Sequence, residues 1–342
     1  MKKFYSTLAL LSLSLCLAIP AFAAEEPIER YSPYDIEGHW AQAEIENFVK
    51  ADLIRGNLDA EGYTDIRPDD KMTRAEFAVM LVNIAGLSSD EAGKEFKDVK
   101  KGVWYSNSIR IASALGIVNG VSPTEFGVTK IVTRAEMATM IVRAYEAKAS
   151  IDFKTGATKF KDVPSNYFAA PYIEKASATG LIGGTSATTF SPKSEATRAQ
   201  VIVVLNRAVM LEKKNLPAEA ELVGIVQAAN KEIMDQMNAG KIDQINWDKY
   251  YTGFEKVDSL ESISQYQEVI AQGATIKYEI VAEENLKVVK SSDRFAVVQS
   301  TGGKIRVTAT NGDRNMTDVM DADGSYYLMK TTDGTWKMYM SK

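Results

Sequence analysis

The chain has 342 residues, of which 45% are hydrophobic and 25% are charged. This composition is typical of globular proteins and leaves room for two or three domains. Forty basic and 45 acidic residues give a formal net charge of -5, which offers no broad basic surface and excludes nucleic acid as a partner. With one histidine, His39, and one cysteine, Cys16, the chain almost lacks the residues for histidine or cysteine catalysis and for a zinc site, so we expect no metal and no cofactor.

Residues 1–23 predict a secretory signal peptide. Lys2 and Lys3 precede an apolar stretch at residues 8–19, which leads to the small-residue site Ala21-Phe22-Ala23. The apolar stretch is about a dozen residues long, shorter than the roughly 20 that span a bilayer, and no later stretch reaches that length. We therefore expect cleavage after Ala23 and a secreted chain with no transmembrane span.

Three copies of one unit follow. Trp40, Trp104 and Phe168 recur at an interval of 64 residues, and an aspartate precedes each of them, at Asp35, Asp98 and Asp162. Each aromatic residue leads into a segment with apolar positions three and four apart, which predicts a helix. Each helix runs into a glycine-bearing turn, and the 64-residue interval returns at Gly56, Gly120 and Gly184. We expect these glycines to take a backbone conformation after the helix that only glycine tolerates.

A second helix in each unit begins with a similar tetrapeptide: Thr73-Arg74-Ala75-Glu76, Thr133-Arg134-Ala135-Glu136 and Thr197-Arg198-Ala199-Gln200. Threonine followed three residues later by glutamate or glutamine predicts a capping box, in which the two side chains satisfy the first amides of the helix. We therefore assign the threonines, Glu76, Glu136 and Gln200 a structural capping role.

The arginines of the tetrapeptides need another explanation, because a cation in the first helical turn opposes the helix dipole. Two readings remain open for Arg74, Arg134 and Arg198. Each arginine could hold an anion at the helix start, beside free amides. Alternatively, each could form an internal ion pair with Asp35, Asp98, Asp162 or another carboxylate.

Together these motifs resemble the S-layer homology (SLH) domain, present as three tandem copies. The resemblance implies an all-α, threefold bundle of helix pairs that binds the bacterial cell wall non-covalently, through a secondary cell wall polysaccharide bearing pyruvate ketals. It also implies that Arg74, Arg134 and Arg198 hold the ketal carboxylate, that Trp40 and Trp104 lie beside the sugar, and that Gly56, Gly120 and Gly184 allow close approach. In this reading Asp35, Asp98 and Asp162 also belong to the carbohydrate site.

Some positions depart from the family pattern. The third copy has Phe168 in place of tryptophan and Gln200 in place of glutamate, so we expect the groove of this copy to be the weaker one. The first copy has Asp52 where a glycine is usual and four extra residues before Pro68. For Trp40 and Trp104, a place in the core or over the helix start is the alternative to sugar contact, and His39 is interpreted as a surface or capping residue.

Beyond residue 211 the pattern changes. Glu212-Lys213-Lys214-Asn215-Leu216-Pro217 predicts a short linker, a long amphipathic helix ends near Gly240, and a second helix covers 260–271. After Gly273 the apolar period becomes two, which predicts five or six antiparallel strands separated by glycine turns. We expect an α+β domain with a curved antiparallel sheet, similar in element order to the nuclear transport factor two-like cone.

The sequence thus predicts a signal peptide at 1–23, repeats at 35–87, 96–146 and 160–210, and a C-terminal domain at 216–342 that folds on its own. Two functions remain. The first is a non-enzymatic protein of the bacterial cell wall or S-layer surface, displaying a C-terminal interaction module of unknown partner. The alternative is a wall-anchored enzyme with a carboxylate-based site in the C-terminal domain, although no spacing identifies such a pair.

Overall fold

The computed structural model describes residues 27–58, 63–156 and 160–342. The predicted signal peptide lies outside the described residues. Within this part of the chain no helix is long and apolar enough to cross a membrane.

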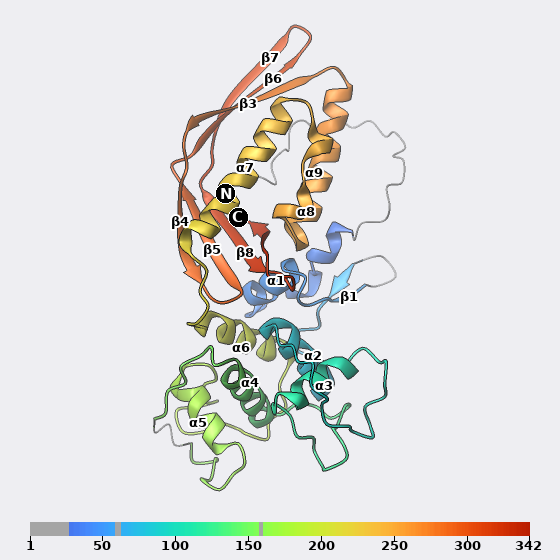
Figure 1. Cartoon of the computed structure of the whole chain (residues 1–342), viewed down its shortest axis with the longest axis vertical. Coiled ribbons are helices and arrows are strands. Elements are labelled where there is room, and N and C mark those ends of the chain that lie inside the picture. Colours follow the sequence, from blue (N-terminus) through green and yellow to red (C-terminus); the bar gives the residue numbers. More distant parts are fainter. Residues whose placement is uncertain (1–26, 59–62, 157–159) are drawn as a thin grey trace.

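The three repeats form the lower half of the molecule in Figure 1. In each repeat a short helix precedes a loop and a longer helix: α1 (Gln42–Lys50) and α2 (Arg74–Ala85), α3 (Ser106–Ala114) and α4 (Arg134–Lys148), and α5 (Ala170–Ala178) and α6 (Arg198–Leu211). The helix pairs cross the repeat boundaries, because α2 packs against α3, α4 against α5, and α6 against α1. The repeats therefore interlock as a closed ring.

Backbone hydrogen bonds close this ring at its centre. The amide of Met72 donates to Ala196 O at 3.2 Å, that of Ala196 to Val132 O at 3.0 Å, and that of Val132 to Met72 O at 2.9 Å. One residue from each repeat thus bonds to the other two, which gives the bundle its threefold pattern.

Two short 3-10 helices, η1 (Ile28–Tyr31) and η2 (Tyr34–Ile36), precede α1. In the first repeat, β1 (Asn57–Leu58) and β2 (Thr64–Asp65) pair as short antiparallel strands between α1 and α2, so this region is helical but not purely α.

The glycine prediction is wrong in its detail. The helices end at Lys50, Ala114 and Ala178, and the left-handed residues that follow them are Asp52 (φ 57°), Gly116 (φ 70°) and Gly180 (φ 78°). Of the three predicted glycines only Gly120 has positive φ, at 87°. All three are instead required by close packing inside their own repeat: a Cβ atom would lie 2.3 Å from Asp65 O at Gly56, 2.4 Å from Glu125 O at Gly120, and 2.5 Å from the Phe160 ring at Gly184.

The C-terminal domain begins with helices. Helix α7 (Glu219–Asn238) is followed by η3 (Ile242–Gln244), α8 (Trp247–Tyr250) and α9 (Gly253–Ala271). Seven strands come next: β3 (Thr275–Ala282), β4 (Asn285–Ser291), β5 (Phe295–Thr301), β6 (Lys304–Asn311), β7 (Arg314–Asp321), β8 (Gly324–Lys330) and β9 (Trp336–Ser341).

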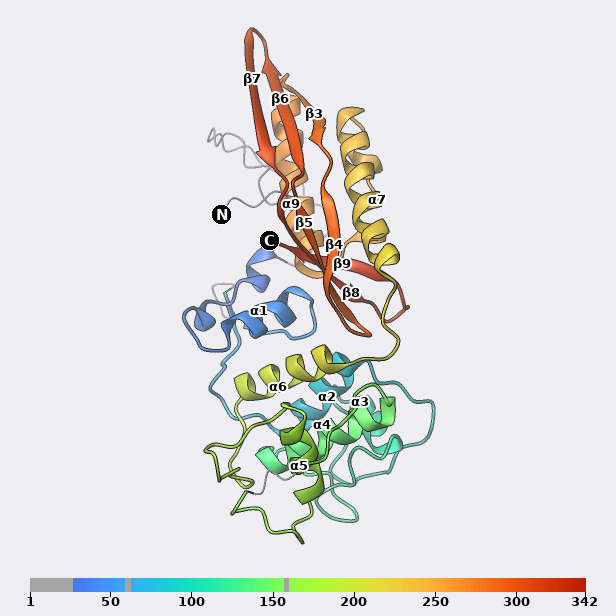
Figure 2. The ribbon, with the colours of Figure 1, turned by 90° about the vertical axis from the view of Figure 1, so that its left-hand side faces the viewer.

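These strands form two antiparallel sheets, β3-β6-β7 and β4-β5-β8-β9, and Figure 2 shows α7 running beside them. The α+β class with an antiparallel sheet is confirmed, whereas the nuclear transport factor two-like cone stays a prediction. The sequence predicted five or six strands and this domain has seven; β7 is exposed along almost all of its length, so its sequence shows no hydrophobic alternation.

One hydrophobic core joins the repeats to the C-terminal domain. Phe254, Phe295 and Tyr339 pack in the same cluster as the core of the repeats, and α1 of the first repeat lies next to the C-terminal domain, where it contacts α9 (Figure 1). Arg294 is buried and donates from Nη1 to Asn83 O at 2.6 Å and to Ile84 O at 2.8 Å, at the C-terminal end of α2.

Only part of the predicted linker at residues 212–217 is exposed to solvent. Glu212 is fully buried and its carboxylate lies 2.8 Å from the Lys148 ammonium, whereas residues 213–216 are exposed. Independent folding of residues 216–342 stays a prediction, and the shared core argues against it.

Candidate functional site

The first turns of α2, α4 and α6 are fully capped by protein groups. In each helix the threonine side chain accepts from the amide three residues on, and the side chain of Glu76, Glu136 or Gln200 accepts from the threonine amide. The next amides donate to the neighbouring repeat: Arg74 N to Lys130 O, Arg134 N to Ser194 O, and Arg198 N to Asp70 O, all within 2.8–2.9 Å. Our expectation of free amides beside the arginines is therefore wrong. Backbone carbonyl oxygens of the neighbouring repeat accept from these amides, where we expected an anion to bind.

Each arginine side chain also reaches into the next repeat. The Arg74 guanidinium lies over the Phe126 ring, donates from Nε to Phe126 O at 3.2 Å, and pairs with Glu136 at 3.1 Å. Arg198 pairs with Glu76 at 3.2 Å. These partners are the capping glutamates of the following repeats, so the internal ion-pair reading holds for Arg74 and Arg198, with partners other than the three aspartates.

Arg134 differs from the other two. Its guanidinium lies over the Phe190 ring, with Nε donating to Phe190 O at 3.0 Å and Nη2 to Gly183 O at 2.7 Å. The capping residue of the following repeat is Gln200, whose side-chain oxygen accepts from the Thr197 amide. Among the described residues Arg134 forms no ion pair, because the third repeat supplies an amide where the others supply a carboxylate.

Burial shapes the electrostatics of these arginines. Burial lowers the pKa of Arg74, and the Glu136 charge opposes that shift. Burial also lowers the pKa of Arg134, opposed by the charge of Asp162. Both groups stay cationic at neutral pH, but the charge of Arg134 is not neutralised by a contacting carboxylate.

The three aspartates hold the loops that receive the arginines. Asp98 accepts from the amides of Phe126 and Gly127 at 2.7 Å each, and Asp162 accepts from Phe190 and Ser191 at 2.9 and 2.7 Å. Asp35 accepts from Ile66 and Arg67 in the same way. Burial opposes ionisation of Asp98 and Asp162, yet these amide bonds lower the pKa of both. The aspartates thus position the carbonyl oxygens of Phe126 and Phe190, which the sequence analysis did not identify as arginine acceptors.

The aromatic residues that open each repeat point outward. Trp40, Trp104 and Phe168 are 62%, 64% and 56% exposed, so the alternative of a core position is wrong. Tyr167 packs its ring 4.7 Å from that of Phe168, and burial together with the charge of Glu136 raises its pKa. The charge of Glu136, in the first turn of α4, thus acts on Tyr167 of the third repeat. We refer to Arg134, its contacts Gly183 and Phe190, and the Tyr167–Phe168 pair together as the Arg134 cleft.

Comparison with known proteins identifies the repeats. The family described as "S-layer homology domain" matches residues 34–78, 95–138 and 159–202. The chain carries three SLH domains. This confirms the resemblance inferred from the motifs.

Curated relatives share these SLH domains. The chain is 30% identical over 66% of its length to the surface-layer 125 kDa protein of Lysinibacillus sphaericus and 32% identical over 42% to a cellulosome-anchoring protein of Acetivibrio thermocellus. It is 33% identical over 53% of its length to exoglucanase XynX of A. thermocellus. The chain spans 18%, 33% and 16% of these relatives.

Two of these relatives are named as a surface-layer and a cellulosome-anchoring protein, in agreement with the expected location at the bacterial cell surface. The enzyme-named relatives share only the SLH region, so the similarity brings no catalytic domain to this chain. A solved structure, the intermembrane space region of the chloroplast protein ARC6, aligns with 37% of this chain and 97% of its own at 15% identity, and its TM-score of 0.28 is too low to support a fold assignment.

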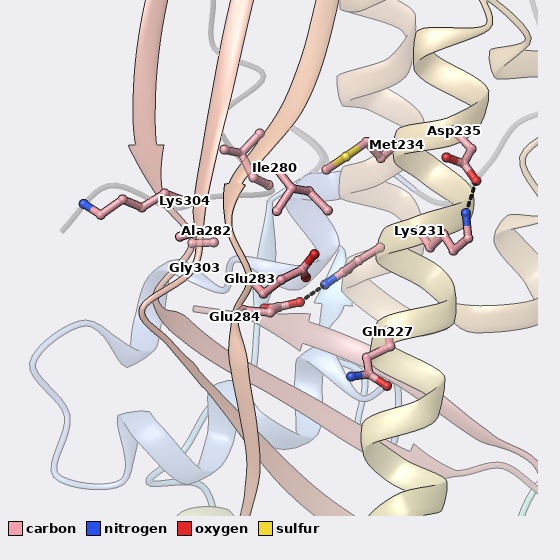
Figure 3. Close-up of a pocket in the computed structure, with 13 residues that line it drawn as sticks. Gln227, Lys231, Met234, Asp235, Ile280, Ala282, Glu283, Glu284, Gly303 and Lys304 are labelled. Carbon is pink, nitrogen blue, oxygen red and sulfur yellow. Dashed lines mark hydrogen bonds and ion pairs between the residues drawn. The ribbon is translucent and has the colours of Figure 1, made fainter.

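The C-terminal domain contains a cavity of about 340 Å³ between α7 and the turn from β3 to β4 (Figure 3). The Glu284 carboxylate accepts from Asn230 Nδ2 at 2.8 Å and from Ser300 Oγ at 2.6 Å, and Lys231 pairs with Asp235 at 2.6 Å. The Glu284, Lys231 and Asp235 side chains thus bond to protein groups, and no histidine, cysteine or serine is among the described lining residues. No group of three potential metal ligands occurs among the described residues. The wall-anchored enzyme stays an untested prediction.

Proposed function

We propose that the chain is a cell-wall anchor that binds pyruvylated secondary cell wall polysaccharide, mainly through the Arg134 cleft, and displays its C-terminal domain at the surface. The observation that carries this proposal is the lack of a carboxylate partner at Arg134, whereas Arg74 and Arg198 each have one. A ligand carboxylate in the other two clefts would compete with a glutamate already in place.

The geometry of Arg134 suits a carboxylate ligand. A guanidinium has five N–H groups, and the bonds to Phe190 O and Gly183 O use two of them. The remaining N–H groups can donate to both oxygens of one ketal carboxylate, which is the strong, charge-assisted geometry. The Phe190 ring, 4.8 Å from the guanidinium carbon, shields one face from water and favours the charged group.

The aromatic residues that we assign to this site suit a sugar. Phe168 offers an exposed ring surface beside Tyr167, and aromatic faces pack well against the apolar faces of sugar rings. We therefore expect Phe168 to contribute at this cleft, and Trp40 and Trp104 to lie beside the other two clefts.

Sedimentation with purified walls tests the proposal. The secreted chain should pellet with walls that carry ketals and not with ketal-free walls. Arg134→Ala should weaken binding at least ten-fold, equivalent to about 1.4 kcal/mol, and Arg134→Lys should restore only part of the affinity because a point charge cannot form the planar fork.

Arg207→Ala serves as the control, since Arg207 is an exposed arginine of α6 outside the cleft. It should leave wall affinity unchanged. If Arg134→Ala lowers the melting temperature and leaves wall affinity intact, Arg134 has a structural role and the proposal is wrong.

A further inference from the structure

A second binding surface lies in the C-terminal domain, on the side of α9 that faces η1, η3 and α8. The groove there has a volume of about 790 Å³. Val257, Leu260, Ser264 and Gln267 line it from α9, at spacings of three and four that place them on one helix face. A smaller hollow continues along the same face past Gln267 to Ala271.

The floor of the groove is apolar. Ile245, Trp247 and Ile263 contribute to it together with Leu260. Leu260 differs from the others because it packs in none of the hydrophobic clusters among the described residues. Its side chain therefore gives the groove an apolar surface that the fold itself does not use.

The rim of the groove is acidic. Glu29 of η1, Asp243 of η3 and Glu261 of α9 line it, and the described residues that line it include no lysine or arginine. Within the described part of the chain none of these three carboxylates forms an ion pair. Burial raises the pKa of Glu261, and the charges of Glu29 and Asp258 raise it further, so the carboxylates repel one another across the rim.

We propose that this groove binds a cationic amphipathic helix of a partner protein. The lined face of α9 from Val257 to Ala271 is about 20 Å long at 1.5 Å per residue, which matches three to four turns of a partner helix. The apolar side of that helix would cover Leu260 and Trp247, and its lysines would relieve the repulsion among the rim carboxylates. An anionic membrane is disfavoured, because the same carboxylates would repel it.

Fluorescence anisotropy with a labelled helical peptide of about 14 leucine and lysine residues tests the proposal on the secreted chain. A peptide with glutamate in place of each lysine is the probe control. The lysine peptide should bind and the glutamate peptide should not. Glu261→Lys and Leu260→Ser should each raise Kd about ten-fold or more, equivalent to about 1.4 kcal/mol, with an unchanged melting temperature.

Glu125→Lys provides a matched charge change, because Glu125 is an exposed loop residue of the second repeat that lies outside the groove. It should change Kd by less than about two-fold, within about 0.4 kcal/mol. Equal weakening by Glu125→Lys and Glu261→Lys would show non-specific charge attraction and overturn the proposal. Binding of the glutamate peptide, or of phosphatidylglycerol vesicles in preference to the lysine peptide, would also overturn it.

Discussion

Arg74 and Arg134 occupy the same position in consecutive repeats, yet the structure gives them different partners. Both guanidinium groups lie over the ring of a phenylalanine and donate to the backbone carbonyl oxygen of the same residue. Arg74 then meets Glu136, whereas the corresponding residue for Arg134 is Gln200, an amide. The two arginines thus differ because of one residue in the next repeat. Arg74 pairs with a glutamate and links two repeats, whereas the charge of Arg134 is available to a ligand.

The comparison also changes our interpretation of Gln200. Gln200 suggested a weakened groove in the third repeat, because it departs from the family pattern. Since the arginine and the glutamate of one cleft come from different repeats, Gln200 instead leaves Arg134 of the second repeat unpaired. A departure from the pattern therefore marks the cleft that we expect to bind best.

The largest effect on stability should come from Arg74→Ala. Arg74 is 5% exposed, and its removal leaves Glu136 with less compensation and Phe126 O without a donor. Removing one partner of a buried ion pair costs about 3 kcal/mol, so urea unfolding should show a loss near that size. Wall affinity of the folded variant should stay near that of the natural chain. A loss of wall affinity without a loss of stability would make Arg74 a ligand residue and remove the difference between the two clefts.

Glu136→Gln gives the second repeat the glutamine that the third repeat has at this position. It should lower stability less than Arg74→Ala does. Glutamine keeps the capping bond, as Gln200 does, and loses the charge that faces Arg74. We expect a loss of about 1–2 kcal/mol, measured by urea unfolding at neutral pH. If stability is unchanged, the Arg74–Glu136 pair contributes nothing and the contrast with Arg134 has no energetic basis.

The same pair should show a pH dependence. Burial opposes ionisation of Glu136, but bonds from Thr133 and the charge of Arg74 lower its pKa below 4.5. The folded state therefore favours the ionised carboxylate, so its stabilisation is complete above pH 4.5 and is lost as pH falls through the lowered pKa. Melting temperatures between about pH 3 and pH 7 should fall less steeply on the acid side in Glu136→Gln than in the natural chain. Parallel curves would contradict the assignment.

Arg198→Ala should have the smallest effect. The side chains of Arg198 and Glu76 are 22% and 30% exposed, and pairs with such access to water contribute about 0–1 kcal/mol. We expect a stability change within that range and less loss of wall affinity than in Arg134→Ala. A larger loss of wall affinity than in Arg134→Ala would make the Arg198 cleft the main binding site.

The sequence was sufficient for the features that are local in the chain. The capping boxes and the helices depend on residues a few positions apart, and the repeats show directly as motifs that recur every 64 residues, so all of these follow from spacing alone. The pairing of Arg74 with Glu136 could not be predicted in this way, since it depends on how the repeats close into a ring. The left-handed position of Asp52 was also missed: Asp52 was noted only as a departure from the glycine of the pattern, and the left-handed conformation was expected at Gly56 instead.

The contact between the repeats and the C-terminal domain also could not be predicted, because it joins residues that are far apart in the chain. Arg294 follows a charged strand and gave no signal in the sequence, yet it binds the carbonyl oxygens that end α2, more than 200 positions away. Phe295 and Tyr339 fit the alternating pattern of strands, but the pattern does not reveal that they pack against the first repeat.

The most direct test of the central claim is wall affinity in a double-mutant cycle of Gln200→Glu and Arg134→Ala. Gln200→Glu supplies the missing carboxylate and keeps the capping box. It should weaken wall binding about five-fold, about 1 kcal/mol, because the new glutamate competes with the ligand for Arg134. In the Arg134→Ala background it should have no further effect, so the two changes should be non-additive. Natural affinity in Gln200→Glu, or equal weakening by Gln200→Glu with and without Arg134, would contradict the claim that the unpaired arginine is the wall-binding group.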